Sequence, residues 1–112
     1  MKISLKEMSG RLPGPISEKW PLGERFVRGM AHGTMSVELY APRGHDPQTP
    51  HVQDELYFIM QGSGELVIAE QRHTCAAGDA FFVPAGVVHR FERFSDDFAT
   101  WVVFWGPDGG EQ

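Results

Sequence analysis

Four of the side chains that can bind a metal ion lie in two short segments of the chain. His51, Gln53 and Glu55 alternate along the first segment, and His89 lies in the second. Because successive side chains of a strand point to opposite faces, these three and Tyr57 share one face if the segment is a regular strand. Imidazole nitrogens, an amide oxygen and a carboxylate suit a divalent ion such as Zn, Fe, Mn or Ni. We therefore predict a metal site formed by His51, Gln53, Glu55 and His89.

Such a site leaves coordination positions open, as Lewis-acid or oxygen-activating catalysis requires. Gln53 has two possible roles, as the fourth ligand or as an anchor for a substrate. Glu55 is a ligand or a group that transfers a proton, and an inward carboxylate needs a partner to offset its desolvation. Glu55 and Gln53 are thus the catalytic candidates. Asp54, on the opposite face, is expected to point outward into solvent.

Glycine and proline residues mark the turns and strand ends in the segment that contains His89. Its pattern is G-x5-P-x-G-x2-H, made by Gly78, Pro84, Gly86 and His89 with an apolar run between the turns. Proline suits the end of a strand because it donates no backbone hydrogen bond to the ladder. Gly86 then allows a tight reversal. The pattern predicts a turn, a short strand, a second turn and His89 on the next strand.

Short β-forming stretches recur along the chain from Arg25 onward, with glycine turns between them and no convincing helix. This spacing predicts an all-β sandwich or barrel. Glycine spacing around Gln61–Gly64 also predicts that 56–60 and 65–69 form a β-hairpin. The expected strands are 26–30, 34–40, 56–60, 65–69, 72–75, 80–83, 88–93 and 98–105.

Residues 1–24 show little periodicity and include several prolines. We interpret them as an arm, with at most one short helical turn, that packs on the barrel or on a partner. Residues 25–112 are expected to form one β-barrel domain, since single domains commonly have about 100–150 residues.

The G-x5-P-x-G-x2-H pattern resembles the second motif of small single-domain cupins. Arg93 stands where that motif usually has asparagine. The first cupin motif is matched in part: Glu55 and Gly62 have the family spacing, His51 falls on the second histidine and Thr49 on the first. An alternative is a variant first motif, H-x-Q-D-E, in which Gln53 occupies a position that is often histidine.

The resemblance implies a double-stranded β-helix, or jelly-roll barrel, extended here by the N-terminal arm. It also implies a metal-dependent enzyme that acts on a small organic molecule, since small cupins include dioxygenases, sugar isomerases and epimerases, and cyclases of aromatic polyketide pathways. The apolar strands and three tryptophans favour an aromatic or apolar substrate. Two alternatives remain: a non-catalytic small-molecule binding protein with a degenerate or empty metal site, and a storage or structural dimer.

Aromatic side chains near the predicted ligands are candidates for the substrate wall. Tyr57, Phe91 and Trp101 could line such a pocket or belong to the plain core. The C-terminal strand Phe98–Trp105 is so apolar that both its faces must be covered, which indicates a homodimer. A dimer is also what the resemblance to small cupins implies.

Composition limits the other classes of partner. The net charge is −5, and the basic residues form no stripe, which argues against nucleic acid. No apolar run approaches the roughly 20 residues of a membrane span, and the N-terminal sequence lacks the core of a secretory signal. A single cysteine, Cys75, excludes an internal disulfide and fits a reducing compartment, so we expect a cytoplasmic protein.

Overall fold

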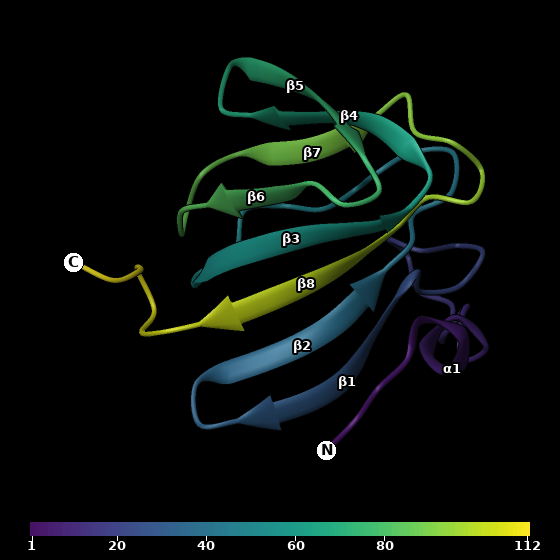
Figure 1. Cartoon of the computed structure of the whole chain (residues 1–112), viewed down its shortest axis with the longest axis horizontal. Helices are drawn as coiled ribbons and strands as arrows, with labels where there is room; N and C mark the ends of the chain where they lie inside the picture. The colour runs from purple at the N-terminus through teal and green to yellow at the C-terminus, as the bar shows by residue number, and fades with distance from the viewer.

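The computed structural model describes residues 1–112 and contains two antiparallel β-sheets that face each other (Figure 1). The larger sheet has the strand order β1-β2-β8-β3-β6, and the smaller has β5-β4-β7. The strands are β1 (Phe26–His32), β2 (Met35–Tyr40), β3 (Asp54–Gln61), β4 (Ser63–Ile68), β5 (Gln71–Ala76), β6 (Ala80–Val83), β7 (His89–Glu92) and β8 (Ala99–Trp105). The prediction of an all-β jelly-roll fold is confirmed.

Alternation of side chains along β8 shows how the larger sheet is built. Thr100, Val102 and Phe104 are buried between the sheets, whereas the intervening side chains are only half-buried on the outer face. β8 pairs with β2 on one side and with β3 on the other, so it is central and fully hydrogen-bonded. Its near-continuous apolar sequence follows from this central position.

The predicted hairpin between 56–60 and 65–69 is wrong. β3 pairs with β6 and β8, whereas β4 pairs with β5 and β7, so the chain crosses from the larger to the smaller sheet between them. Gly62 makes this corner with a φ of +80°, and a Cβ at that position would lie 2.3 Å from the Ser95 hydroxyl oxygen. The glycine signal is therefore correct as a turn, but local spacing does not reveal which sheet each strand joins.

Aromatic side chains fill the space between the two sheets. Phe91 of β7 is 1% exposed, and its ring centre lies 4.9 Å from that of Tyr57 and 4.8 Å from that of Phe98. Tyr57 comes from β3, so these contacts join the smaller sheet to the larger one. Edge-on and tilted ring pairs of this kind stabilise a core beyond the burial of their area.

The N-terminal residues cover part of the outer face of the larger sheet. Helix α1 (Leu5–Ser9) is capped by Ser4, whose hydroxyl accepts a hydrogen bond from the Glu7 backbone N–H at 3.1 Å. Met8 is completely buried in a small apolar cluster with Leu39, Ala41 and Ala99. The helix therefore attaches to the sheet through one fully buried side chain.

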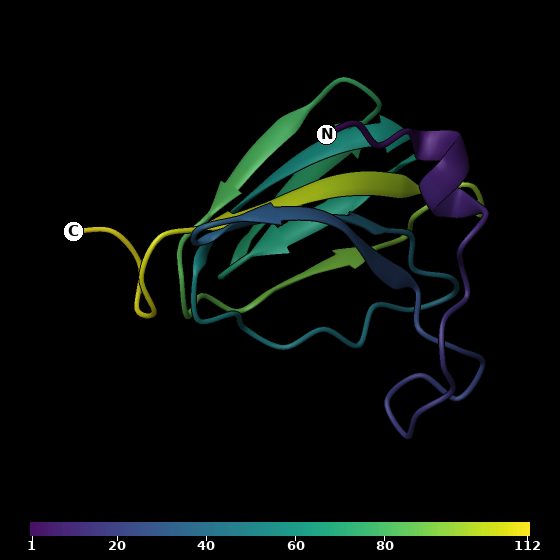
Figure 2. The same cartoon turned by 90° about the horizontal axis from the view of Figure 1, so that it is seen from below.

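Residues that follow α1 form a loop at the same end of the sheets (Figure 2). Trp20 returns from this loop into the space between the sheets, where it is 8% exposed and packs against Phe26 and Tyr40. The placement of a domain boundary at residue 25 stays a prediction. The structure contains no helix of the length and apolar character that a membrane crossing requires.

Met8→Ala should lower the free energy of unfolding by about 2–4 kcal/mol, because it leaves a cavity in a fully buried cluster. Met1→Ala is the matched control, since Met1 is 94% exposed. Denaturant unfolding of both variants measures the difference. Equal stability of the two variants would show that α1 does not contribute to the folded core.

Candidate metal centre

Three of the predicted ligands converge between the two sheets. His51 precedes β3, Glu55 is the second residue of β3, and His89 is the first residue of β7. One possible ligand atom from each lies within 4.8 Å of the others. Since β3 and β7 belong to different sheets, the cluster forms only when the sheets are packed together.

The backbone fixes the orientation of the His89 ring. Its Nδ1 donates a hydrogen bond to the Val87 carbonyl oxygen at 2.8 Å, so Nε2 faces the cluster. Nε2 lies 2.8 Å from Oε1 of Glu55, and both side chains are 1% exposed. This arrangement matches the way metal-binding histidines are held, with one nitrogen on a carbonyl group and the other directed at the ion.

Glu55 provides the test of whether the cluster fits a metal ion. Its Oε2 is buried and has no hydrogen-bond partner, while Oε1 contacts His89. Buried polar atoms are almost always paired, because an unpaired one loses its hydration without compensation. A divalent cation beside the imidazoles would satisfy this oxygen. The donor set therefore fits a metal ion with mixed nitrogen and oxygen ligands.

The surroundings shift the pKa values of the two histidines in opposite directions. Burial lowers the pKa of His51, although the charge of Glu55 opposes this effect. Burial also acts against the charged form of His89, but the hydrogen bond and charge of Glu55 outweigh it and raise the pKa of His89. Glu55 therefore favours the charged form of His89, whereas burial disfavours the charged form of His51.

Gln48 joins the cluster although the sequence analysis did not identify it. Its Oε1 lies 3.3 Å from Nε2 of His51 and 3.1 Å from Nε2 of His89. It also accepts a hydrogen bond from the Tyr57 hydroxyl at 3.0 Å. Gln48 lies in the proline-rich loop 41–50, where no periodic pattern indicates which side chains turn inward. The feature of the sequence that could have identified Gln48 is its position immediately before Thr49, which stands in place of the first histidine of the motif.

Gln53 lies outside the cluster, which corrects its prediction as a ligand and catalytic group. Its amide nitrogen donates hydrogen bonds to the carbonyl oxygens of Thr34 at 3.1 Å and Gly106 at 2.9 Å. Regular β3 begins only at Asp54, so strict alternation does not extend back through Gln53. The amide therefore links two loops instead of facing the imidazoles.

Asp54 is buried, contrary to the expectation that it points into solvent. It is 6% exposed, and its carboxylate accepts backbone hydrogen bonds from Glu111 and Ala85, both at 2.9 Å. These two N–H groups lower the pKa of Asp54. The residue ties the C-terminal segment to the Pro84–Gly86 turn, which leads towards His89.

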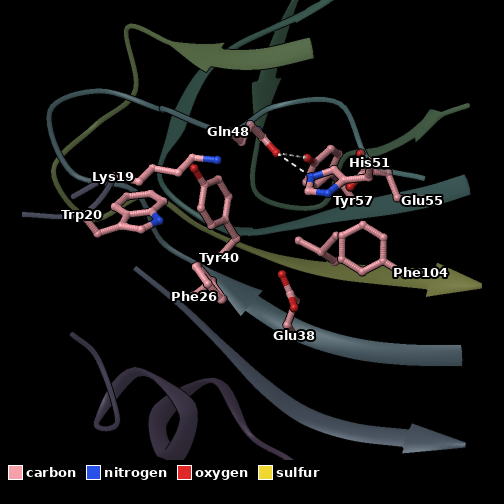
Figure 3. A pocket seen from close by; sticks show the side chains of 11 residues that line it. Lys19, Trp20, Phe26, Glu38, Tyr40, Gln48, His51, Glu55, Tyr57 and Phe104 are labelled. Atoms are coloured by element: carbon pink, nitrogen blue, oxygen red, sulfur yellow. Dashed lines mark hydrogen bonds between the residues drawn. The ribbon is translucent and has the colours of Figure 1, made fainter. Parts of the chain in front are cut away.

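A cavity of about 280 Å³ opens beside the cluster (Figure 3). Its walls combine apolar and aromatic side chains with a smaller number of polar groups, and three of the latter belong to the cluster. The lining residues are Lys19, Trp20, Phe26, Glu38, Tyr40, Gln48, His51, Glu55, Tyr57, Val102 and Phe104. An apolar cavity with a few convergent polar groups is typical of a small-molecule site.

One of the three predicted wall residues lines this cavity. Tyr57 does so, whereas Phe91 packs behind it in the core. Trp101 points to the opposite face of the larger sheet, where it packs against the cluster around Met8. Successive side chains of a strand point to opposite faces of the sheet. Because Val102 faces the cavity, its neighbour Trp101 faces outward. The predictions for Phe91 and Trp101 as substrate walls are therefore corrected.

Glu38 is a charged cavity residue that the sequence analysis missed. It lies on the inner face of β2, and its carboxylate points into the cavity (Figure 3). Burial raises the pKa of Glu38 to about 7, with Arg28 lowering it and Glu55 raising it further. Neither carboxylate oxygen takes part in a hydrogen bond or ion pair within the protein. Such a group is available to a bound molecule.

Comparisons with known proteins place the chain in a family. The model for the cupin domain (Cupin_2) matches residues 36–105. An uncharacterized protein of Streptomyces coelicolor is 36% identical over 85 residues, which cover 74% of this chain and 81% of the relative.

Solved structures show the same fold. A Cupin 2 conserved barrel domain protein from Salinispora arenicola has a TM-score of 0.68 and 22% identity, covering 95% of this chain and 89% of the other. The DMSP lyase DddQ from Ruegeria pomeroyi has a TM-score of 0.63 and 24% identity, covering 74% of this chain and 48% of the lyase. These likenesses show the fold, and the match of the cupin-domain model over residues 36–105 shows that the chain belongs to the cupin family.

Proposed function

We propose that this protein is a metal-dependent enzyme that acts on a small organic molecule bound in the cavity. The observation that carries the proposal is the convergence of His51, Glu55 and His89 beside that cavity, which His51 and Glu55 line, with one carboxylate oxygen unpaired. A structural ion site would be closed on all sides by protein ligands, whereas this one is open to a pocket. Openness of this kind favours catalysis.

The two histidines and Glu55 would hold the ion. A divalent cation supplies Lewis-acid chemistry or, if it is redox-active, oxygen activation. The burial of Glu55 and His89 keeps these side chains in one orientation and excludes water from that side of the cavity. In a site with little water, charge–charge interactions are stronger than in solution.

The cavity indicates a substrate with an apolar or aromatic body. Trp20, Phe26 and Phe104 supply flat apolar surfaces, and the volume of about 280 Å³ suits a molecule smaller than most drugs. Dioxygenase, isomerase and cyclase reactions all take place on molecules of this kind. The similarity to the lyase DddQ extends to the fold alone, so it does not select among these reactions.

Glu38 is the best-placed group for proton transfer. Glu55 is committed to His89, whereas the Glu38 carboxylate faces the cavity without a partner. A pKa of about 7 allows this carboxyl group both to accept and to release a proton near neutral pH. We therefore assign the proton-transfer role to Glu38 in place of Glu55 and Gln53.

A non-catalytic binding protein is the second candidate. It is favoured by the direct contact between His89 and Glu55, which neutralises the cluster when His89 is protonated and requires no ion. In that case the cavity would bind a small molecule through its aromatic walls and Glu38 without changing it.

Metal analysis of the protein purified without chelators separates the two candidates. We expect bound divalent metal in the wild type and its loss in both His51→Ala and His89→Ala, because each removes a neutral nitrogen donor. Binding should weaken as the pH falls, since protons compete for His89, whose pKa is raised. Full metal content in both variants would rule out the enzyme proposal.

A screen of small aromatic and sugar substrates, with oxygen uptake and mass spectrometry as readouts, then tests catalysis.

Glu38→Gln should make the protein more stable at neutral pH. The carboxyl pKa is about 7 in the folded protein against 4.5 ordinarily, so folding retains a proton that the unfolded chain has lost. Wild-type stability should therefore fall as the pH rises from 4.5 to 7, and the variant should lack this loss, which is on the order of 2 kcal/mol. Urea unfolding across this pH range provides the measurement. A difference between the two proteins that does not vary with pH would contradict the burial of the charge.

We also propose that the protein is a homodimer. Phe58 of β3 and Phe82 of β6 lie on the outer face of the larger sheet and are 41% and 50% exposed, and Trp105 lies next to Phe82. Apolar side chains grouped on one sheet face favour contact with a second copy. Phe58→Glu should reduce the mass in sedimentation to that of a monomer, whereas Leu22→Glu, on an exposed loop, should not. A wild type that sediments as a monomer at micromolar concentration would refute the proposal.

A further inference from the structure

We infer that Gln48 is the fourth protein ligand of the metal centre and that Asp46 is the residue that positions it. This inference rests on the proposed function, because it adds a donor to the same centre. Gln48 lies outside the motif position of the missing histidine, which Thr49 occupies.

The distances from the Gln48 oxygen to the two imidazole nitrogens fit donor atoms arranged around one small cation. Oε1 of Gln48 lies 3.3 Å from Nε2 of His51 and 3.1 Å from Nε2 of His89, which is itself 2.8 Å from Oε1 of Glu55. Bonds of about 2.1 Å place neighbouring donors about 3.0 Å apart in an octahedral site and about 3.4 Å apart in a tetrahedral one. The Gln48 oxygen therefore has the separation expected of a ligand.

Asp46 determines which end of the Gln48 amide faces the histidines. Nε2 of Gln48 donates to Oδ2 of Asp46 at 2.6 Å, and a carboxylate can only accept, so the amide oxygen must point the other way. Asp46 is held in turn by the backbone N–H groups of Gln48 at 3.1 Å and Phe91 at 2.8 Å, and by the Tyr40 hydroxyl. The orientation is thus built into the core.

The hydroxyl of Tyr57 leaves room for a metal bond. It donates to Oε1 of Gln48 at 3.0 Å and so uses one of the two lone pairs on that oxygen. The second lone pair is directed at the imidazole nitrogens, which carry no proton when they bind an ion. The same oxygen can therefore keep its contact with Tyr57 and coordinate a cation.

The donor set would contain two nitrogens and two oxygens, where a histidine at this position would make it three nitrogens and one oxygen. Carboxylate and carbonyl oxygens suit Mn²⁺, whereas imidazole suits Zn²⁺, Fe²⁺ and Ni²⁺. Gln48 would therefore shift the preference of the centre towards Mn²⁺. It is a specificity-determining ligand for the metal, and Asp46 acts through it.

Cobalt titration of the metal-free full-length protein tests the inference, with calorimetry for affinity and the visible spectrum of Co²⁺ for its ligands. Gln48→Met keeps the size of the side chain but removes the oxygen, so Co²⁺ affinity should fall by about ten- to a hundredfold and the spectrum should change. Gln53→Met is the matched control, because Gln53 lies outside the cluster, and it should bind as the wild type does.

Two further variants separate coordination from structural support. Asp46→Asn should weaken Co²⁺ binding by about tenfold, because the amide of Gln48 is then free to turn its nitrogen towards the histidines. Gln48→His should restore Co²⁺ binding and raise the affinity for Zn²⁺ relative to Mn²⁺ by at least tenfold. A purely structural role for Gln48 would not produce this change in metal preference.

Wild-type affinity and an unchanged spectrum in Gln48→Met would overturn the inference. The centre itself would still stand if His51→Ala and His89→Ala lose Co²⁺, and it would fall if they do not. Should Gln48→Met fail to fold, the Gln48→His variant decides: an unaltered ratio of Zn²⁺ to Mn²⁺ affinity would equally overturn the role of Gln48.

Discussion

The contact between Glu55 and His89 is the constraint on which the rest of the site depends. It places a carboxylate and an imidazole, both nearly inaccessible to water, across the boundary between the two sheets. Removing two such groups from water is costly, and an ion pair in the interior seldom recovers the whole cost. A fold selected for stability alone would place apolar side chains there. The pair is therefore better explained by the metal binding that we propose than by a contribution to stability.

The surroundings of that pair explain how its geometry is maintained. Val87 holds one nitrogen of His89, Asp46 holds the amide of Gln48, and Tyr57 contacts both the Gln48 oxygen and the aromatic core. Each contact comes from a different part of the chain, so the cluster cannot rearrange without disturbing the packing between the sheets. Preorganisation of this kind is what allows a site to bind an ion without first paying to order its ligands.

The sequence predicts the fold and the two histidines well because glycine, proline and alternation are local signals. The turn at Gly86 and the strand before Pro84 both follow from backbone chemistry, and the structure has both. The errors arise where local signals stop. Gln53 precedes the regular strand, so alternation does not apply to it, and the inward turn of Gln48 depends on Asp46 and a distant backbone N–H at Phe91. Trp101 was expected at the cavity, but adjacent side chains of a strand point to opposite faces of the sheet, so it lies on the outer face.

Part of the cavity wall comes from a segment of the chain that the family model does not include. Lys19, Trp20 and Phe26 line the cavity, yet the match to the cupin domain begins at residue 36. The matched region thus contains the candidate metal ligands, while the segment before it forms part of the cavity wall. Two relatives could keep the same candidate metal ligands and still bind different small molecules if they differed only in the segment before the cupin domain. The metal ligands and the selectivity for the bound molecule would then evolve in separate regions of the same chain.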